Sequence, residues 1–290
     1  MSSSRRVVLA GLVPGLGALA AACSPLRTFN TLAPKDGGGR LVARGVAYGE
    51  GPRRALDLYA PAATGAGRPL VVFVYGGSWN SGERAGYGWL GRALAAQGFV
   101  VAVPDYRLVP EVRFPSFVED VAAAVARART EAPRFGADPD RVVLVGHSAG
   151  AYTAVLLALD PRYLERAGVP PNAVRGAAGL AGPYDFYPFD AGSAVAAFGE
   201  FPEPEQTQPI TFARGDAPPL WLATGDADET VRPRNSVRLG EAVRARGGQA
   251  EVKLYPGVDH IGIVLALSRP FRGRAPVLAD LTDFVRRVAG

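Results

Sequence analysis

The sequence has few of the residues that hold metals and disulfides. Its 290 residues include one cysteine and two histidines, so an internal disulfide is excluded and no cluster has metal-ligand spacing. Lysine occurs only at Lys35 and Lys253, and the net charge of +5 comes from arginines that do not interleave with aromatic residues. No phosphate-binding loop or internal repeat is present. We therefore expect no metal, no cofactor and no nucleic-acid partner.

The N-terminus has the pattern of a bacterial export signal. Two arginines precede an apolar stretch from Val7 to Ala22, which is too short for a comfortable transmembrane helix. The stretch ends in Leu-Ala-Ala-Ala before Cys23, which resembles a lipoprotein cleavage box. We expect residues 1–22 to be removed, Cys23 to anchor the protein by a lipid on the periplasmic side of the cell envelope, and residues 23–40 to form a tether. The alternative is a plain secretory signal and a periplasmic or secreted protein.

Residues 41–290 alternate short apolar runs with helix-like patterns, as expected of one α/β domain. Most runs lack polar alternation, which indicates a largely parallel sheet covered by helices on both faces. Apolar stripes predict helices around Val118–Ala128 and Leu278–Val288. The predicted strands are 41–48 and 55–59, which form an antiparallel hairpin, followed by 70–75, 99–103, 142–145, 176–180, 220–223 and 251–255.

A candidate nucleophile lies directly after the apolar run 142–145. Residues 146–150 read Gly-His-Ser-Ala-Gly, and an apolar helix-like segment follows them. Strand, G-x-S-x-G and helix in this order are typical of a strained turn that exposes a serine, here Ser148. The two glycines are needed because a Cβ at either position would crowd the neighbouring strand or helix. The alternative is a structural turn without chemistry.

The serine needs a base and an orienting carboxylate, because its hydroxyl is a weak nucleophile by itself. His147 adjoins the serine inside the turn, and its ring is expected to point away from the Ser148 side chain. The remaining histidine, His260, follows a strand-like run and is the candidate base. In proteins that present a serine on such a strand–turn–helix, the order along the chain is serine, acid, histidine. The acid is therefore expected between Ser148 and His260. Three carboxylates compete in the acidic loop after 220–223; they are Asp226, Asp228 and Glu229.

A glycine-rich turn at residues 76–79, Gly-Gly-Ser-Trp, follows the apolar run 70–75. Such a turn can aim backbone N–H groups at a carbonyl oxygen and so form an oxyanion hole. An ordinary tight turn is the alternative. The position of the turn, two strand–helix units before Ser148, favours the oxyanion hole.

Five motifs in order make the chain resemble a known superfamily. Tyr-Gly-Gly-Ser-Trp lies at 75–79, Asp-Tyr-Arg-Leu-Val-Pro-Glu at 105–111 and Gly-His-Ser-Ala-Gly at 146–150, before Gly-x-x-Asp-x-x-Val at 225–231 and then His260. This series resembles the serine-esterase side of the α/β-hydrolase superfamily, near its acetyl-esterase, feruloyl-esterase-like and formamidase-like groups. The resemblance implies an α/β-hydrolase fold, a mostly parallel sheet with helices on both faces and a small lid.

The same resemblance assigns roles to individual residues. It selects Asp228 as the acid, and it implies that the backbone N–H groups of Gly77, Ser78 and Ala149 are the oxyanion donors. Tyr75 stands where the family usually has a histidine that braces the oxyanion loop, and a tyrosine hydroxyl can make a similar brace. Three further residues of the matched motifs are expected to form a structural hydrogen-bond cluster behind the site, namely Asp105, Arg107 and Glu111.

Residues 183–218 interrupt the strand–helix order and are too long for a simple connection, which predicts a lid. Its aromatic side chains, with Trp79 beside the oxyanion turn, either line a pocket or pack the lid onto the helices below. The candidate pocket residues are Trp79, Tyr184 and Phe186.

The function expected from these residues is hydrolysis of a small-molecule carboxylic ester through an acyl-enzyme. Ser148 would be the nucleophile, His260 the base and Asp228 the residue that orients it. Short-chain or aryl esters are favoured over long triglycerides, because the lid is small. The alternatives are an amide or formamide hydrolase with the same triad and a non-catalytic binding protein that has kept the fold.

Overall fold

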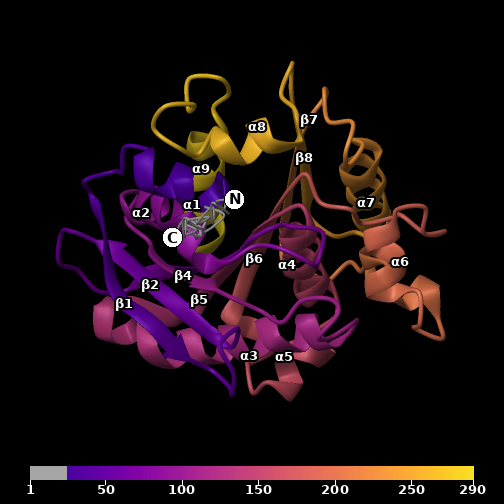
Figure 1. The fold of residues 1–290 in the computed structure, drawn as a ribbon, viewed down its shortest axis with the longest axis horizontal. Helices are drawn as coiled ribbons and strands as arrows, with labels where there is room; N and C mark the ends of the chain where they lie inside the picture. The colour runs from indigo at the N-terminus through magenta and orange to yellow at the C-terminus, as the bar shows by residue number, and fades with distance from the viewer. Residues whose placement is uncertain (1–24) are drawn as a thin grey trace, which may run out of the picture.

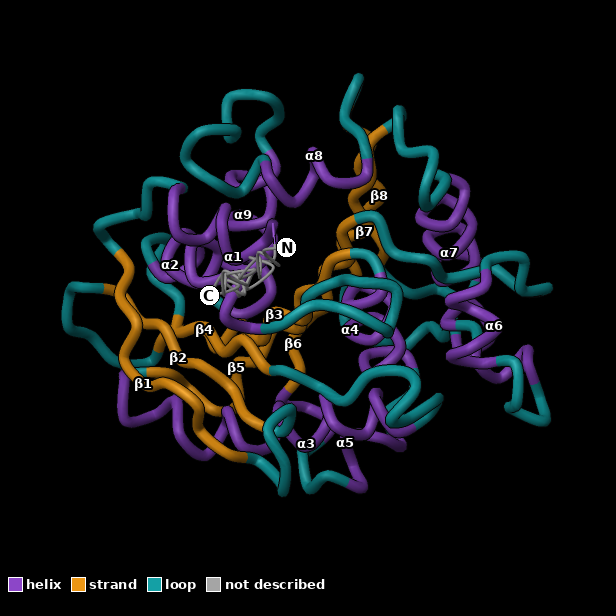
Figure 2. The backbone as a smooth tube through the Cα atoms, viewed as in Figure 1, coloured by secondary structure: helices purple, strands orange, loops and turns teal. Residues whose placement is uncertain are grey.

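The computed structural model describes residues 25–290, and its centre is one eight-stranded sheet. Figures 1 and 2 show this sheet between layers of helices. The strand order is β1-β2-β4-β3-β5-β6-β7-β8. The strands are β1 (Gly39–Ala47), β2 (Ala55–Pro61), β3 (Arg68–Val74), β4 (Val100–Pro104), β5 (Ala137–His147), β6 (Val174–Leu180), β7 (Leu220–Gly225) and β8 (Ala250–Tyr255).

The sheet is mostly parallel, as the apolar runs predict. Strand β2 is antiparallel to both of its neighbours, β1 and β4, whereas β3 to β8 pair in parallel. Strand β5 pairs with β3 on one side and β6 on the other, and its last six residues, 142–147, are all buried. The α/β-hydrolase fold expected from the motifs is thus confirmed.

Helices cover both faces of the sheet. α2 (Gly88–Ala95) and α9 (Val277–Ala289) pack on one face, and α3 (Ser116–Glu131) and α4 (Ala149–Leu159) pack on the other (Figure 1). Every residue of α4 is buried, because this helix follows the central strand and is covered on all sides. The remaining helices are α1 (Pro25–Leu32), α5 (Arg162–Arg166), α6 (Gly192–Phe198), α7 (Arg234–Ala245) and α8 (His260–Leu265).

Helix α1 differs from the tether predicted for residues 23–40. Phe29 packs edge-on against Trp89 of α2, with ring centroids 5.4 Å apart. Asn30 accepts a hydrogen bond from the Trp89 backbone N–H at 2.9 Å, so it caps the start of α2 from outside the helix. Strand β1 then begins at Gly39. The folded domain therefore starts before residue 41, because apolar and capping contacts that are distant in sequence hold α1 in place.

The segment predicted as a lid, 183–218, connects β6 to β7 and carries α6 with the short 3₁₀ turns η4 (Pro204–Thr207) and η5 (Pro209–Phe212). The expected signal segment 1–22 and the candidate lipidation site Cys23 lie outside the described residues. Within 25–290, no helix is long and apolar enough to cross a membrane.

Candidate active site

Ser148 lies in the sharp turn between β5 and α4, at the centre of the sheet. Its φ is 54°, in the left-handed region that few residues other than glycine adopt, and its N–H donates to the carbonyl of Leu180 at 2.9 Å. A Cβ at Gly146 would lie 2.2 Å from the carbonyl oxygen of Gly150, and one at Gly150 would lie 2.1 Å from that of Val74. Both glycines are therefore required by the close approach of strand and helix, as the motif predicts.

The structure brings Ser148, His260 and Asp228 into one line of hydrogen bonds. Nε2 of His260 lies 2.9 Å from the Ser148 Oγ, and its Nδ1 lies 2.8 Å from Oδ2 of Asp228. The other carboxylate oxygen of Asp228 accepts the backbone N–H groups of Thr230 at 3.0 Å and Val231 at 2.8 Å. Asp228 is buried, so these bonds replace the water that a carboxylate would otherwise hold. Ser148, His260 and Asp228 thus have the geometry of a serine-hydrolase triad.

The two other carboxylates of the acidic loop have different surroundings. Oδ1 of Asp226 accepts the backbone N–H of Gly257 at 2.7 Å, so it fastens the loop that leads to the histidine. Glu229 is exposed and lines the cleft described below. Of the three candidates, Asp228 is the one that contacts His260.

The turn at 76–79 approaches Ser148 with free backbone donors. Gly77 has a φ of 129° and Ser78 one of 50°, and the Gly77 carbonyl accepts the N–H and the hydroxyl of Ser81 at 3.0 and 2.9 Å. Within residues 25–290, the N–H groups of Gly77, Ser78 and Ala149 donate to no other group. Ser78 and Ala149 line the same cleft as Ser148. Uncommitted N–H groups beside a nucleophile are what an oxyanion hole requires.

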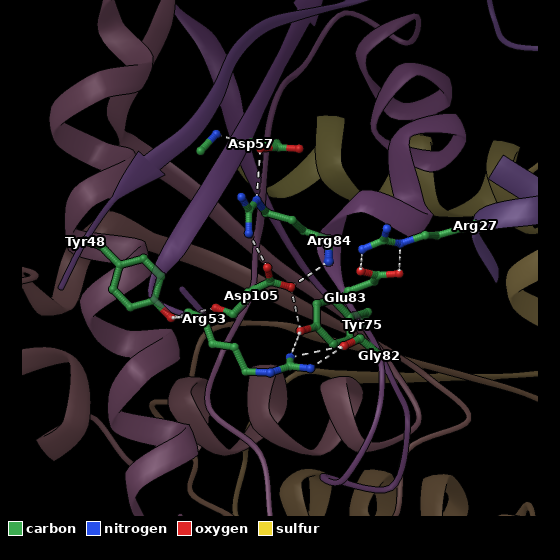
Figure 3. A network of polar contacts seen from close by, with 10 residues as sticks. Arg27, Tyr48, Arg53, Asp57, Tyr75, Gly82, Glu83, Arg84 and Asp105 are labelled. Carbon is green, nitrogen blue, oxygen red and sulfur yellow. Dashed lines mark hydrogen bonds and ion pairs between the residues drawn. The ribbon is translucent and has the colours of Figure 1, made fainter. Parts of the chain in front are cut away.

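A polar network behind this turn includes Tyr75, as Figure 3 shows. The Tyr75 hydroxyl donates to Oδ1 of Asp105 at 2.8 Å, and the same oxygen accepts the backbone N–H of Arg84 at 2.6 Å. The guanidinium of Arg53 donates to the carbonyl of Gly82 at 3.1 and 3.2 Å, at the far end of the turn. Hydrogen bonds therefore hold the chain on both sides of the turn at 76–79, and the Tyr75 hydroxyl contributes one of them.

The cluster predicted behind the site is only partly formed. Asp105 joins the network around Tyr75, whereas Arg107 pairs separately with the buried Asp120 at 2.8 Å. Glu111 is exposed and forms no hydrogen bond or ion pair within the described chain, so its predicted place in the cluster is wrong. It follows the cis peptide bond between Val109 and Pro110, in a turn at the surface.

Ser148 lines a cleft of about 620 Å³ between the turn at 76–79, the segment 183–218 and the residues around the start of α7. Trp79 and Phe186 line it and stack on each other, with centroids 6.0 Å apart and planes 18° apart. Phe198 of α6 packs edge-on against Trp79 at 4.8 Å. The two explanations for the aromatic residues thus both apply, because Trp79 and Phe186 line the cleft and also pack the lid.

Tyr184 does not line the cleft, contrary to the prediction. It is fully buried, and its ring packs over Gly179 and Gly182, where added Cβ atoms would collide with it. The Asn235 side chain accepts its backbone N–H at 2.9 Å. The absence of side chains at the two glycines leaves room in the core, and the tyrosine ring fills it.

His147 is a residue whose role the sequence did not reveal. Its ring is buried, and Nε2 lies 2.9 Å from the backbone carbonyl oxygen of His260. Burial, followed by the nearby His260, lowers the pKa of His147 to about 4. The two residues are 113 positions apart, so no local signal could have paired them. Between residues 25 and 290, no cluster of His, Cys, Asp or Glu is suited to a metal ion.

The fold and the line of hydrogen bonds at Ser148 define the class of the protein: this is the arrangement of an α/β-hydrolase of the serine-hydrolase type. A family model described as BD-FAE matches residues 56–243. The chain therefore belongs to the BD-FAE family.

Relatives with curated names are esterases. The chain is 31% identical over 260 residues to the isoprenylcysteine alpha-carbonyl methylesterase ICME of Arabidopsis thaliana. The aligned region covers 82% of this chain and 60% of the relative. It is 32% identical over 249 residues to the esterase LipC of Mycobacterium tuberculosis, with 75% and 59% covered. The chain thus spans about three fifths of the length of these relatives.

Solved structures agree on the fold. An esterase B from Lactobacillus rhamnosis superimposes with a TM-score of 0.80 at 22% identity and covers 91% of this chain and 90% of that one. A truncated carbohydrate esterase from gut microbiota gives 0.77 at 21% identity, with 89% and 99% covered.

Proposed function

We propose that this protein hydrolyses carboxylic esters through an acyl-enzyme formed on Ser148. The observation that carries the proposal is the unbroken line from Asp228 through His260 to the Ser148 Oγ, at 2.8 and 2.9 Å. The names of the relatives, a methylesterase and an esterase, support ester hydrolysis.

The mechanism follows from this line of hydrogen bonds. The Ser148 Oγ attacks the ester carbonyl while Nε2 of His260 takes its proton. Nδ1–H of His260 donates to Asp228, which fixes the tautomer and stabilises the imidazolium. The imidazolium then protonates the leaving alkoxide, and a water molecule activated by His260 releases the acid from Ser148.

The oxyanion is stabilised by backbone groups. The free N–H groups of Gly77, Ser78 and Ala149 are the donors, because no other group in the described chain competes for them. In serine hydrolases each such donor contributes about 2.7–4 kcal/mol in the transition state. The left-handed backbone at Ser78 costs energy, whereas Gly77 adopts its positive φ without a steric penalty, and the hydrogen bonds to Ser81 and around Tyr75 offset the cost at Ser78.

We infer the substrate class from the cleft. Its volume of about 620 Å³ lies in the range of small-molecule sites, and Trp79 and Phe186 give it an apolar wall, which favours a short acyl chain or an aromatic ring over a long lipid chain. Amide and formamide hydrolysis would use the same groups, so the choice between ester and amide is a matter of measured rates.

The test compares the purified protein with Ser148→Ala on p-nitrophenyl esters of increasing acyl length, beside methyl esters and a formanilide. We expect ester turnover that falls by about 10⁴–10⁶-fold in the variant. Preferred turnover of the formanilide would indicate the amide hydrolase. Absence of Ser148-dependent turnover on every substrate would contradict catalysis and favour a non-catalytic binding protein.

We also propose that the N-terminal segment exports the protein to the cell envelope and that Cys23 carries a lipid. The support is the sequence pattern of residues 1–23. Metabolic labelling with a radioactive fatty acid should mark the wild-type protein and not Cys23→Ala; labelling of neither would indicate a plain secretory signal.

A further inference from the structure

His147 joins two parts of the molecule that the chain itself keeps far apart. It is the last residue of β5, directly before Ser148, and its ring is turned towards the base rather than the nucleophile. Nε2 lies 2.9 Å from the carbonyl oxygen of His260, and the two rings have centroids 5.0 Å apart. A carbonyl can only accept, so Nε2 carries the proton and donates it.

The other bonds that hold the base come from a different side. Asp226 accepts the N–H of Gly257, and the N–H of Ala227 donates to the carbonyl of Val258 at 3.2 Å. Asp226 and Ala227 belong to the loop after β7, which also carries Asp228. Strand β8, which leads to His260, pairs only with β7 and lies at the edge of the sheet. Among the hydrogen bonds of the described chain, two therefore connect His260 to β5 and the residue after it. One joins the side chains of Ser148 and His260, and the other runs from the His147 ring to the His260 carbonyl.

The protonation state of His147 suits its role as a hydrogen-bond donor to the His260 carbonyl. Burial disfavours its charged form and lowers its pKa, and the nearby His260 ring acts in the same direction. The hydrogen bond to the His260 carbonyl and then the Asp228 carboxylate act in the opposite direction, but burial prevails. His147 is therefore neutral at physiological pH. It keeps one N–H donor and adds no positive charge beside His260 when that ring becomes an imidazolium.

We propose that His147 is a positioning residue that holds the backbone of His260 at a fixed distance from Ser148. The inference rests on the proposed function, because the fixed distance matters for proton transfer between Oγ and Nε2. Reacting groups must be held within about 0.5 Å, and a misplacement of about 1 Å can cost about 100-fold in rate. His260 follows an edge strand and a loop that contains Gly257, with a φ of 66°, and the bond from His147 ties its backbone to the central strand.

The test compares His147→Leu, which removes the donor, with His147→Gln, whose amide N–H can reach the same carbonyl. The readout is the rate constant for labelling of Ser148 by a fluorophosphonate. In that reaction Oγ forms a bond to phosphorus, fluoride leaves and His260 takes the proton, so no knowledge of the natural substrate is needed. We expect His147→Leu to slow labelling and ester kcat by about 10–100-fold with little change in KM, and His147→Gln to stay within about threefold of the wild type.

The matched control is Thr282→Val. Thr282 is buried in α9, and its hydroxyl donates to the carbonyl of Leu278 at 2.7 Å without contact to the base loop or to the proposed oxyanion donors. The variant loses a buried hydrogen bond of similar kind, and its labelling rate is expected to stay near that of the wild type. Rates are compared well below each variant's unfolding temperature, so partial unfolding is excluded.

Two results would overturn the inference. Equal labelling of wild type and His147→Leu, or no recovery in His147→Gln relative to His147→Leu, would show that the hydrogen bond does not position the base, while the proposed function would stand. No labelling of the wild type at Ser148 would overturn the proposed function itself.

Discussion

The proposed nucleophile, Ser148, and the proposed base, His260, are held by different kinds of structure. Ser148 follows a strand paired on both sides, and all residues of the helix after it are buried. His260 follows an edge strand whose residues are mostly half-exposed or exposed, and a short loop lies between. Ser148 is therefore positioned by close packing on both sides, whereas His260 depends on the hydrogen bonds of its loop and on a few buried neighbours such as Val258 and Ile263. Changes on the two sides should have different consequences.

The largest effect is expected on the base side, from Asp228→Asn. An amide in this place keeps the volume but favours the wrong tautomer of His260, and in serine proteases the equivalent change lowers kcat by about 10⁴-fold. Steady-state ester hydrolysis measures the effect. Asp283→Asn, an exposed aspartate of α9 outside the cleft, is the control and should leave kcat nearly unchanged. A similar loss in both variants would contradict the role of Asp228.

A pair of glycine substitutions compares the two sides directly. A Cβ at Gly150 would lie 2.1 Å from a backbone carbonyl oxygen of β3, so Gly150→Ala should cost several kcal/mol of unfolding free energy or prevent folding. At Gly257 an added Cβ meets open space, so only the left-handed φ of 66° counts, and Gly257→Ala should cost about 1–2 kcal/mol. Denaturant unfolding measures both. Equal costs would contradict the contrast between packing and hydrogen bonding.

The pH dependence of stability should reveal His147. Its pKa is about 4 in the folded protein, below the usual 6.5, so the unfolded chain binds the proton first as the pH falls. The free energy of unfolding that depends on a neutral His147 is fully present above pH 6.5. It is lost between about pH 6.5 and 4, by about 3 kcal/mol in total. Unfolding free energies of wild type and His147→Gln should therefore converge or cross as the pH falls through this window. Parallel curves would contradict a buried, neutral His147.

A smaller effect is expected from Asp226→Ala. The change removes the acceptor for the Gly257 N–H, which is one of several bonds that hold the base loop. We expect kcat to fall by about 3–10-fold and KM to change little, since one hydrogen bond to a charged group contributes about 1.5–3 kcal/mol and the loop keeps its others. Asp216→Ala removes an exposed aspartate whose partner is Arg214, and it is the control. A loss as large as that of Asp228→Asn would show that the base loop depends on this bond alone.

Much of the fold could be predicted from the sequence because it depends on short-range patterns. Continuous apolar runs predict buried parallel strands, and the structure has a strand at each predicted place. Glycines at 146 and 150 around Ser148 predict the turn, because the clash that they avoid is local.

The rest depended on contacts between distant segments. Tyr184 was expected in the pocket, but the space over two glycines of the core accommodates its ring. Glu111 was expected in a cluster, and a surface turn places it in solvent. Residues 25–32 were expected in a tether, and Phe29 and Asn30 dock them on α2. None of these contacts has a periodicity or a spacing that a linear pattern can show.

The sequence by itself determined the order of strands and helices and the turn that presents Ser148, because sterics and apolar periodicity act over a few residues. The residues alone left three neighbouring carboxylates open, and the family resemblance selected Asp228. The tertiary structure shows the contact of Asp228 with His260, and it alone decided that His147 donates to the backbone of a residue 113 positions away. Those choices depend on how loops at the carboxyl ends of separate strands meet. A hydrogen bond forms only when its two groups lie within about 3 Å, and that proximity is a property of the whole fold.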